Sequence, residues 1–352
     1  MTTAAGYLDV VAPGLMTSVQ DLGRLGHQAL GMPVAGAMDP VALRLANALA
    51  GNPENAAGLE IGYLGPTLAV AADSLRIAFM GNAKLTLQPA GGGEARPLKP
   101  GRSVLLRRGD RIAIGALEDA SVGYLAIAGG LALAPFLGSL STYMRAGLGG
   151  FAGRALQAGD RLPLAQAAGP DDDERELPGS FEYGSGPVRV VLGPQDDRFT
   201  AAGIAAFLGG DYAVTKEADR MGLRLEGAAV EHVKGADIAS EGLVTGSIQV
   251  PGNGQPIILM ADRQTTGGYT KIATVVSADL PRVGRLRPGD RLSFAAVSVA
   301  EAEAARRQQE QAIRALIDGI RQAEPDARLD LDALYKENLI SGAVDAPSGH
   351  WR

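Results

Sequence analysis

Short apolar runs separated by turn residues dominate the hydrophobic pattern of this chain. They are bounded by Gly, Pro, Asn and Asp, and most are too short for a helix of ordinary length. The strands predicted from them include residues 8–11, 67–70, 75–79, 103–106, 124–128, 188–192, 223–226 and 257–260. The pattern is typical of a mainly β fold with a few helices.

Two segments carry helical patterns. The first begins at Asp39, a good N-cap followed by Pro40, and ends at Gly51, with Leu45 and Leu49 on one face. The second and longest begins with the capping box Ser298-Val-Ala-Glu301. Its apolar positions recur at helical spacing, at Ile313, Leu316, Ile317 and Ile320.

A Gly-Asp-Arg-(Ile/Leu) tetrapeptide occurs at residues 109–112, 159–162 and 289–292. We interpret it as a turn that recurs before a strand. Coincidence remains an alternative, because Gly-Asp is a common turn pair.

The strongest boundary signal lies at residues 166–187, where Gly-Pro pairs flank the acidic run 171–174. This run is expected to remain solvated in a linker. The predicted organisation is a domain at 1–165, a linker at 166–187, a second domain at 188–297, and a helix with a tail at 298–352. Apolar residues at 334–340 predict that the tail docks on the fold.

Composition excludes several classes of protein. The 352-residue chain has a net charge of −6, which gives no basic footprint for nucleic acid. It has no cysteine and three distant histidines, so a metal centre and a Ser-His-Asp triad are poorly supported. No apolar run is long enough to span a bilayer, and a cytoplasmic location is expected.

The densest polar chemistry lies in residues 261–274, directly after a predicted strand. An acid, a base, an amide, hydroxyls, a phenol and an ammonium group occur around the glycine pair 267–268. Loops of β-rich proteins often carry binding groups, so we favour a functional site over an ordinary polar hairpin.

A second candidate is the glycine-rich stretch 141–154, which contains Arg145 and Arg154. Backbone N–H groups and guanidinium groups suit a carboxylate or phosphate. A structural turn is an equally good reading of this stretch.

Several long motifs resemble one known family. They are residues 11–24 (VAPGLMTSVQDLGR), 36–39 (GAMD), 51–60 (GNPENAAGLE), 141–143 (STY), 219–222 (DRMG), 261–271 (ADRQTTGGYTK) and 338–342 (NLISG). Together they resemble the biotin-dependent carboxyltransferase family. It includes the KipA-type C subunit of 5-oxoprolinase, allophanate hydrolase subunit 2 and the carboxyltransferase part of urea amidolyase.

The resemblance implies two cyclophilin-like β-barrel domains plus a C-terminal helix. It also implies an ATP-dependent hydrolase component, inactive alone, that works with a KipI-type B subunit and with an A subunit to open 5-oxo-L-proline (pyroglutamate) to L-glutamate. The alternatives are a biotin-dependent carboxyltransferase acting on urea or a similar amide, and a KipA-like regulator that binds a kinase inhibitor. The chain contains no biotin-carrier motif of the Met-Lys-Met type, which favours the 5-oxoprolinase branch.

The substrates of both enzyme branches present an N–H beside a C=O. We therefore predict that Lys271, Asp262 and Tyr269 are catalytic, with Lys271 stabilising a carbonyl or phosphoryl oxygen. The residues predicted to bind substrate are Gln264, Thr265, Ser240, Glu241, Gln249, Arg145, Tyr143, Asp39 and Glu60. No metal site is predicted.

Structural roles remain open for some of these residues. Lys271 and Asp262 are able to form an ion pair across a hairpin, and Glu60 follows the pattern of a buried, paired carboxylate. Asp39 is explained by helix capping alone. Arg220 is interpreted either as a site residue or as the partner of Asp219 in a turn.

Overall fold

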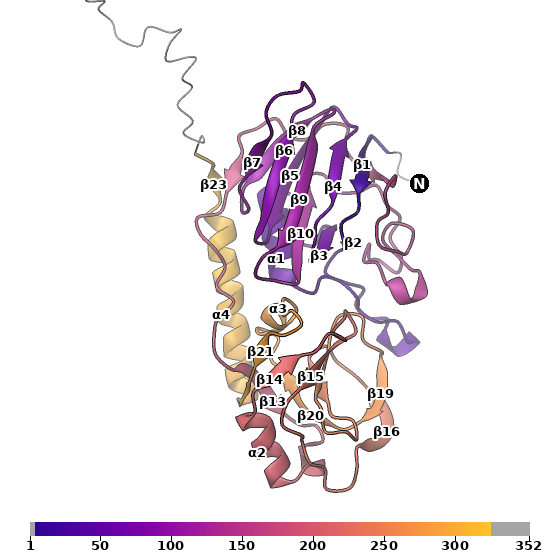
Figure 1. Cartoon of the computed structure of the whole chain (residues 1–352), viewed down its shortest axis with the longest axis vertical. Coiled ribbons are helices and arrows are strands. Elements are labelled where there is room, and N and C mark those ends of the chain that lie inside the picture. The colour runs from indigo at the N-terminus through magenta and orange to yellow at the C-terminus, as the bar shows by residue number, and fades with distance from the viewer. Residues whose placement is uncertain (1–3, 325–352) are drawn as a thin grey trace, which may run out of the picture. The chain divides into compact units, whose positions relative to one another are not determined.

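The computed structural model describes residues 4–324 (Figure 1). By its internal contacts the chain divides into the units Met1–Gln322 and Ala323–Arg352, and the helices and strands found in the described residues belong to the first unit. The predicted tail contact at residues 334–340 lies outside the described residues. The boundaries predicted for the two domains and the linker stay a prediction.

The fold is mainly β, as the sequence predicts. Its described helices are α1 (Pro40–Ala50), α2 (Ala201–Gly209), α3 (Leu280–Val283) and α4 (Val299–Asp318), with 3-10 turns η1 (Gln28–Leu30), η2 (Met144–Ala146) and η3 (Asp196–Arg198).

Two antiparallel sheets form the N-terminal half. The six-stranded sheet has the order β11 (Arg161–Leu164), β1 (Gly6–Ala12), β4 (Thr67–Val70), β9 (Arg111–Leu117), β6 (Ala83–Gln88) and β7 (Arg96–Leu98). The five-stranded sheet has the order β2 (Met16–Gln20), β3 (Gly58–Gly62), β10 (Val122–Ile127), β5 (Ser74–Met80) and β8 (Ser103–Arg107). Both sheets bury side chains in one apolar core, which includes Leu8, Leu68, Ile77 and Leu125.

The C-terminal half is built on one eight-stranded sheet. Its order is β21 (Arg291–Leu292), β14 (Tyr212–Val214), β15 (Gly222–Glu226), β18 (Ile257–Leu259), β17 (Ser247–Gln249), β20 (Lys271–Val275), β13 (Val188–Leu192) and β22 (Phe294–Ala296). The edge strands β21 and β22 are separated only by Ser293, so the sheet must curl until its edges meet, which makes a nearly closed barrel.

Two small sheets complete the fold. Strands β16 (Asp237–Gly242) and β19 (Thr266–Tyr269) form a two-stranded antiparallel sheet, which we call the β16–β19 arm. Strands β12 (Arg175–Glu176) and β23 (Arg321–Gln322) form the other.

The three Gly-Asp-Arg segments form the same turn, as the repeat suggests. In each, the aspartate accepts a hydrogen bond from the backbone N–H three residues earlier: Arg107 to Asp110 (2.8 Å), Gln157 to Asp160 (2.7 Å) and Arg287 to Asp290 (2.8 Å). The preceding glycine has a φ of +85°, +87° or +94°, a conformation that other residues adopt only with strain. The turns lead into β9, β11 and β21.

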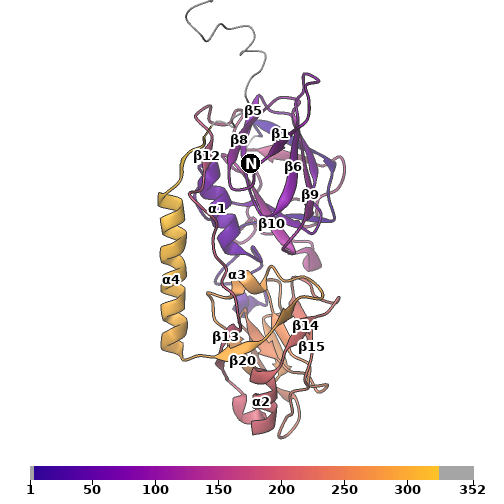
Figure 2. The same cartoon turned by 60° about the vertical axis from the view of Figure 1, so that its left-hand side comes forward.

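The two predicted helices form with the predicted caps. Asp39 accepts hydrogen bonds from the N–H groups of Val41 and Ala42, and Gly51 ends α1 at a φ of +81°. Ser298 and Glu301 make the reciprocal capping box of α4. Helix α4 runs beside α1 and β13 (Figure 2), and its buried Ile313 packs with Val41 and Leu45 of α1.

The acidic run 171–174 is less free than the sequence suggested. Asp172 forms an ion pair with Arg76 (3.0 Å), and Glu174 forms one with Arg102 (2.7 Å). The fully buried Arg76 also donates to backbone carbonyls of residues 170, 172 and 173. Asp171, Asp172 and Asp173 are exposed, as predicted for a solvated run, and the run in addition supplies the acceptors that the buried arginine needs.

An ionic network joins α4 to the segment around α1. The Arg44 guanidinium donates to Glu54 (2.7 Å) and, through two nitrogens, to Glu310 of α4 (2.7 and 2.8 Å). This bidentate contact lowers the pKa of Glu310 from about 4.5 to about 2.

A depressed pKa predicts an acid-sensitive contact. Stability from Glu310 is present above its unfolded pKa of about 4.5 and is lost as the pH falls toward about 2. Glu310→Gln should lower the free energy of unfolding at pH 7 by on the order of 1 kcal/mol, because water screens this partly exposed pair. The loss between pH 5 and pH 3 should be smaller in the variant than in the wild type, measured by urea unfolding. Equal losses would show that this contact contributes nothing to acid sensitivity.

Candidate functional site

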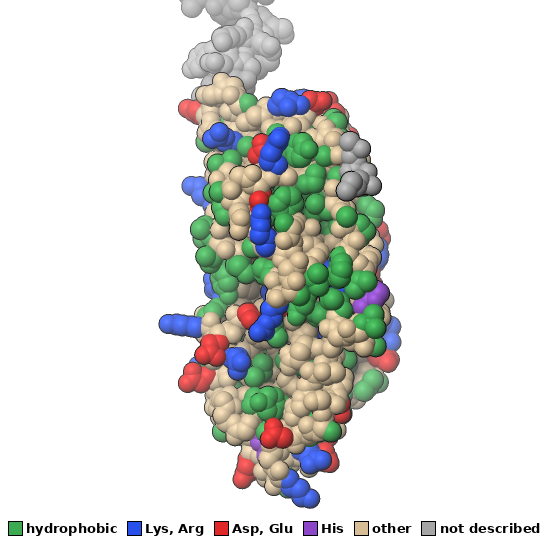
Figure 3. All heavy atoms as spheres, turned by 90° about the vertical axis from the view of Figure 1, so that its right-hand side faces the viewer, with side chains coloured by type: hydrophobic (Ala, Val, Ile, Leu, Met, Phe, Trp, Pro, Cys, Tyr) green, Lys and Arg blue, Asp and Glu red, His purple; other side chains and the backbone are tan. Residues whose placement is uncertain are grey.

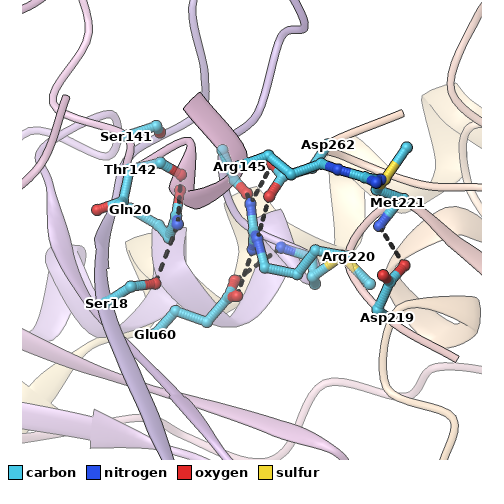
Figure 4. A network of polar contacts seen from close by, with 12 residues as sticks. Ser18, Gln20, Glu60, Ser141, Thr142, Arg145, Asp219, Arg220, Met221 and Asp262 are labelled. Carbon is cyan, nitrogen blue, oxygen red and sulfur yellow. Dashed lines mark hydrogen bonds and ion pairs between the residues drawn. The ribbon is translucent and has the colours of Figure 1, made fainter. Parts of the chain in front are cut away.

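Arg220 links the two halves of the fold (Figure 4). It lies in the turn before β15. Its Nη1 donates to Glu60 of β3, and its Nε and Nη2 donate to Asp262 after β18, at 2.9 and 3.0 Å. A further bond from Nη2 reaches the carbonyl of Gly36 (2.7 Å). One guanidinium therefore neutralises two buried carboxylates from different sheets.

The pKa values reflect this arrangement. Burial raises the pKa of Asp262, and the charge of Arg220 opposes that rise. Burial works against the charge on Arg220, but Glu60 and Asp262 more than offset it, so the pKa of Arg220 is raised.

Glu60 is buried and paired, as its sequence context suggested. Its Oε2 accepts from the Met38 backbone N–H (2.9 Å) and from the Tyr124 hydroxyl (2.6 Å). Both Asp262 oxygens are held by Arg220, so this carboxylate supports the site from behind instead of facing a pocket. Neither of the ion pairs left open as structural alternatives, Lys271–Asp262 and Arg220–Asp219, is formed, because Arg220 pairs with Asp262 and Lys271 pairs with Glu241.

Asp39 is a structural residue. Its side chain is fully buried, caps α1, and accepts from the Tyr183 hydroxyl (2.6 Å) and from Arg285 (3.4 Å). Burial raises its pKa, while the bond from Tyr183 opposes the rise. With all its contacts made inside the fold, Asp39 is not placed to touch substrate.

Four of the predicted residues, Arg145, Gln249, Gln264 and Tyr269, line one pocket of about 420 Å³, which we call the polar pocket. Its other lining residues are Glu217, Asp219, Met221, Gly222, Arg224, Ile257 and Leu259. Residues far apart in the sequence thus supply two guanidinium groups, two carboxylates, two amides and a phenol to one space, and one guanidinium, that of Arg224, is paired with Glu217 (3.4 Å). Such a set suits a small ligand that carries an anionic group and an amide edge.

Gln249 contributes an unpaired donor to this pocket. Its side chain is 2% exposed, and its Nε2 meets no hydrogen-bond partner among the described residues. A buried donor without a partner is unfavourable, so a ligand acceptor would relieve that cost.

Lys271 lies opposite Gln249 in the β17–β20 pairing, so the two side chains share one face of the sheet. Its ammonium group pairs with Glu241 of β16. Gln195 connects both residues: its Oε1 accepts from the Lys271 backbone N–H (3.1 Å), and its Nε2 donates to Glu241 (2.6 Å). The Lys271 ammonium lowers the pKa of Glu241.

The remaining predicted residues lie around the polar pocket and the Lys271–Glu241 pair. Ser240 is exposed on β16 of the β16–β19 arm, and Thr265 is half-buried just before β19. The Thr265 carbonyl accepts from the Leu243 N–H (2.9 Å). Tyr143 is half-buried and precedes η2, which carries Arg145 into the polar pocket.

A second pocket, of about 210 Å³, adjoins the Arg220 link and was missed from the sequence. We call it the methionine pocket, because Met16, Met38 and Met144 line it together with Glu60 and Arg220. Asp219 lines both pockets, so they lie on either side of the same turn. No local pattern marks this site, since its residues come from both halves.

The glycine-rich stretch 141–154 is explained by close packing. A Cβ added at Gly149 would lie 2.2 Å from the Ser141 carbonyl oxygen, and one at Gly153 would lie 2.0 Å from the Gly147 carbonyl oxygen. Both glycines have positive φ. They let the loop fold onto its own backbone, which favours the structural turn over a phosphate loop.

The described residues lack two kinds of feature. They contain no group of three or more His, Asp or Glu side chains arranged to hold a metal ion. Within the same part of the chain, no helix has the length and apolar character needed to cross a bilayer.

Comparison with known proteins decides the family. The family model described as "Carboxyltransferase domain, subdomain A and B" matches residues 30–296. The chain belongs to this carboxyltransferase family. This chain is 36% identical to the C subunit of 5-oxoprolinase from Escherichia coli (strain K12) over 307 residues, which cover 86% of this chain and 95% of that protein.

Solved structures agree with this assignment. The structure of TTHA0988 superposes on this chain with a TM-score of 0.72 at 36% identity. The superposition covers 82% of this chain and 55% of the TTHA0988 chain, so this chain spans about half the length of TTHA0988. The K. lactis urea amidolyase superposes with a TM-score of 0.80 at 28% identity, over 92% of this chain and 21% of its own. The family resemblance predicted from the motifs is confirmed.

Proposed function

We propose that this chain is the C subunit of an ATP-dependent 5-oxoprolinase, acting with the A and B subunits of that enzyme to open 5-oxo-L-proline to L-glutamate. The main support is the polar pocket, in which Arg145, the unpaired Gln249 amide and Gln264 surround one space. Two cyclophilin-like barrels are the domain architecture that goes with this proposal. The near full-length match to the C subunit of 5-oxoprolinase from Escherichia coli supports this branch of the family.

The proposed chemistry follows from the substrate. A lactam is stabilised by amide resonance, so opening it requires activation of the carbonyl and stabilisation of the negative charge that develops on oxygen. Lys271 is proposed to supply this charge stabilisation, with Tyr269 as a nearby donor. Gln264 and the side-chain oxygen of Gln249 are proposed to bind the amide edge, and Arg145 a phosphate. Asp262 acts through Arg220, as a positioning residue.

ATP fits this scheme as a ligand of the assembled complex. Arg145 gives the polar pocket a guanidinium group, which is the donor chemistry that a phosphate or carboxylate requires, whereas Arg224 is paired with Glu217 in the same pocket (3.4 Å). ATP would supply the phosphoryl group that activates the lactam carbonyl.

A surface feature supports the proposed partners. Leu15, Leu25 and Leu30 of the N-terminal half are 64%, 73% and 79% exposed. Hydrophobic side chains gather on one face of the molecule, between scattered charges (Figure 3). Such patches often bind other proteins, in line with an obligate complex.

The deciding experiment reconstitutes the complex. This chain, mixed with its own A and B subunits, should release glutamate from 5-oxo-L-proline in an ATP-dependent reaction, and release should stop when this chain is omitted. Assembled, folded subunits that release no glutamate would contradict the proposal. Carboxyl transfer between biotin and urea would then be tested next, a reading favoured by the likeness to the K. lactis urea amidolyase.

A further inference from the structure

Arg263 is a buried cation without a counter-charge. It lies between Asp262 and Gln264, is 1% exposed, and donates from Nη2 to the Leu243 carbonyl at 3.2 Å. Its Nε and Nη1 meet no partner, and no carboxylate lies within ion-pair distance of it among residues 4–324. Several N–H donors are therefore left without an acceptor in the interior.

Comparison with other buried arginines shows how unusual this is. Arg220 has two carboxylates, and Arg24, although two of its nitrogens are also unpaired, lies near the charges of Asp21 and Asp262. For Arg263, burial lowers the pKa and no neighbouring charge offsets it. A buried guanidinium in this position is unfavourable unless something anionic reaches it.

A second unpaired donor lies against the same segment. A Cβ built on Gly267 of β19 would lie 2.7 Å from the Gln249 Nε2 and 2.8 Å from the Leu243 Cδ1, and Leu243 also supplies the carbonyl that Arg263 holds. Gly267 thus lets the Gln249 amide and the Leu243 side chain pack directly against the backbone of β19, which places the Gln249 donor under the arm and beside the residue that Arg263 contacts. The unpaired donors Arg263 Nε, Arg263 Nη1 and Gln249 Nε2 suit oxygen atoms that carry negative charge.

The β16–β19 arm covers this region. Gly267 belongs to the arm, and most residues of β16 are exposed. A two-stranded sheet is only marginally stable by itself, so the arm is the element able to shift and admit a ligand.

We propose that Arg263 and Gln249 form an anion subsite beneath the β16–β19 arm, which accepts a carboxylate or phosphoryl group of a small ligand. The subsite adds a ligand group to the proposed function. Anion binding does not depend on that function, but the assignment of the carboxylate to a cyclic amide substrate rests on it. Within the same loop, Arg263 then binds the anionic end of the ligand while Lys271 faces the reacting end.

The test measures thermal unfolding of the full chain with three probes at matched ionic strength: 5-oxo-L-proline, 2-pyrrolidinone, which lacks the carboxylate, and inorganic phosphate. At least one of the two anions should raise the melting temperature of the wild type, and 2-pyrrolidinone should not. A response to 5-oxo-L-proline alone identifies the substrate carboxylate, and a response to phosphate alone identifies a phosphoryl subsite.

Variants separate binding from folding. Arg263→Met should raise at least tenfold the anion concentration that is needed to increase the melting temperature. Its melting temperature without ligand should equal that of the wild type or exceed it, because an uncompensated charge is removed. Arg220→Met, which removes a paired arginine, should instead melt earlier. Gly267→Ala should also weaken the anion response, since its Cβ would lie 2.7 Å from the Gln249 Nε2 and displace that donor, and the neighbouring Gly268→Ala, whose Cβ meets no atom closer than 3.2 Å, should keep it.

Three results would overturn the subsite: no anion response in the wild type, an unchanged response in Arg263→Met, or an early-melting Arg263→Met. Failure of the proposed function is a separate result, because it appears as absent glutamate release in the assembled complex and leaves anion binding to the chain intact.

Discussion

Replacing Lys271 by methionine should reduce ATP-dependent glutamate release by the assembled complex about 10²–10³-fold, which is the range found when a donor to a developing oxyanion is removed. The loss should fall on kcat more than on KM, because the charge stabilises the transition state more than the bound substrate. Initial rates over a range of 5-oxo-L-proline concentrations measure both constants.

The stability of Lys271→Met should change little. Methionine keeps the length of the buried side chain, and the abandoned Glu241 carboxylate is 43% exposed, so water can solvate it. Lys84→Met, a change at an exposed position of β6, is the matched control and should keep full activity. A Lys271→Met protein that unfolds, or one that turns over at the wild-type rate, would remove Lys271 from the catalytic proposal.

Replacing Arg220 by methionine should lower the free energy of unfolding at pH 7 by about 3–5 kcal/mol, the usual cost of removing one partner from a buried ionic group. Glu60 and Asp262 are 5% and 7% exposed in their side chains, so both carboxylates would remain buried without a counter-charge. Equilibrium unfolding in urea measures the loss.

The pH dependence of Arg220→Met distinguishes this mechanism from simple loss of packing. Without the guanidinium, burial raises the pKa of Asp262 in the folded state unopposed, so folding favours its protonated form. The stability contributed by Asp262 is then greatest below its unfolded pKa and falls as the pH rises through its folded pKa. The deficit relative to the wild type should therefore be smaller at pH 5 than at pH 7. Arg220→Lys should be intermediate, since one ammonium cannot match the fork that serves Glu60, Asp262 and Gly36. A deficit that does not vary with pH would show that charge compensation is not the cause.

Local features of the sequence predicted much of the fold. The caps Asp39 and Ser298, and the Gly-Asp turns, form from hydrogen bonds between residues two or three positions apart, so a short stretch of sequence contains all that they need. The apolar runs predicted strands for the same reason, because alternation and turn residues act within a few positions. The family motifs, too, are contiguous and were recognised without a fold.

The pairing of charges depended on the tertiary structure. Arg220 meets Glu60 across 160 residues and Asp262 across 42, through strands of two different sheets. Lys271 meets Glu241 across 30 residues, although Asp262 is nearer in sequence. Which acid reaches which base is set by strand register and sheet order, and neither is encoded in the residues of the loop itself.

The sequence alone therefore determined the family, the mainly β class, the helix ends, the repeated turn, and a loop rich in polar chemistry. Only the tertiary structure decided that Asp39 and Asp262 face inward, that Arg145 and Gln249 share a pocket, and that Arg263 has no carboxylate beside it in the part of the chain that the structure describes. The physical reason is the distance along the chain between the residues that interact. Caps and turns are satisfied by neighbours along the chain, whereas the burial and the partner of a charged side chain depend on segments that only folding brings together.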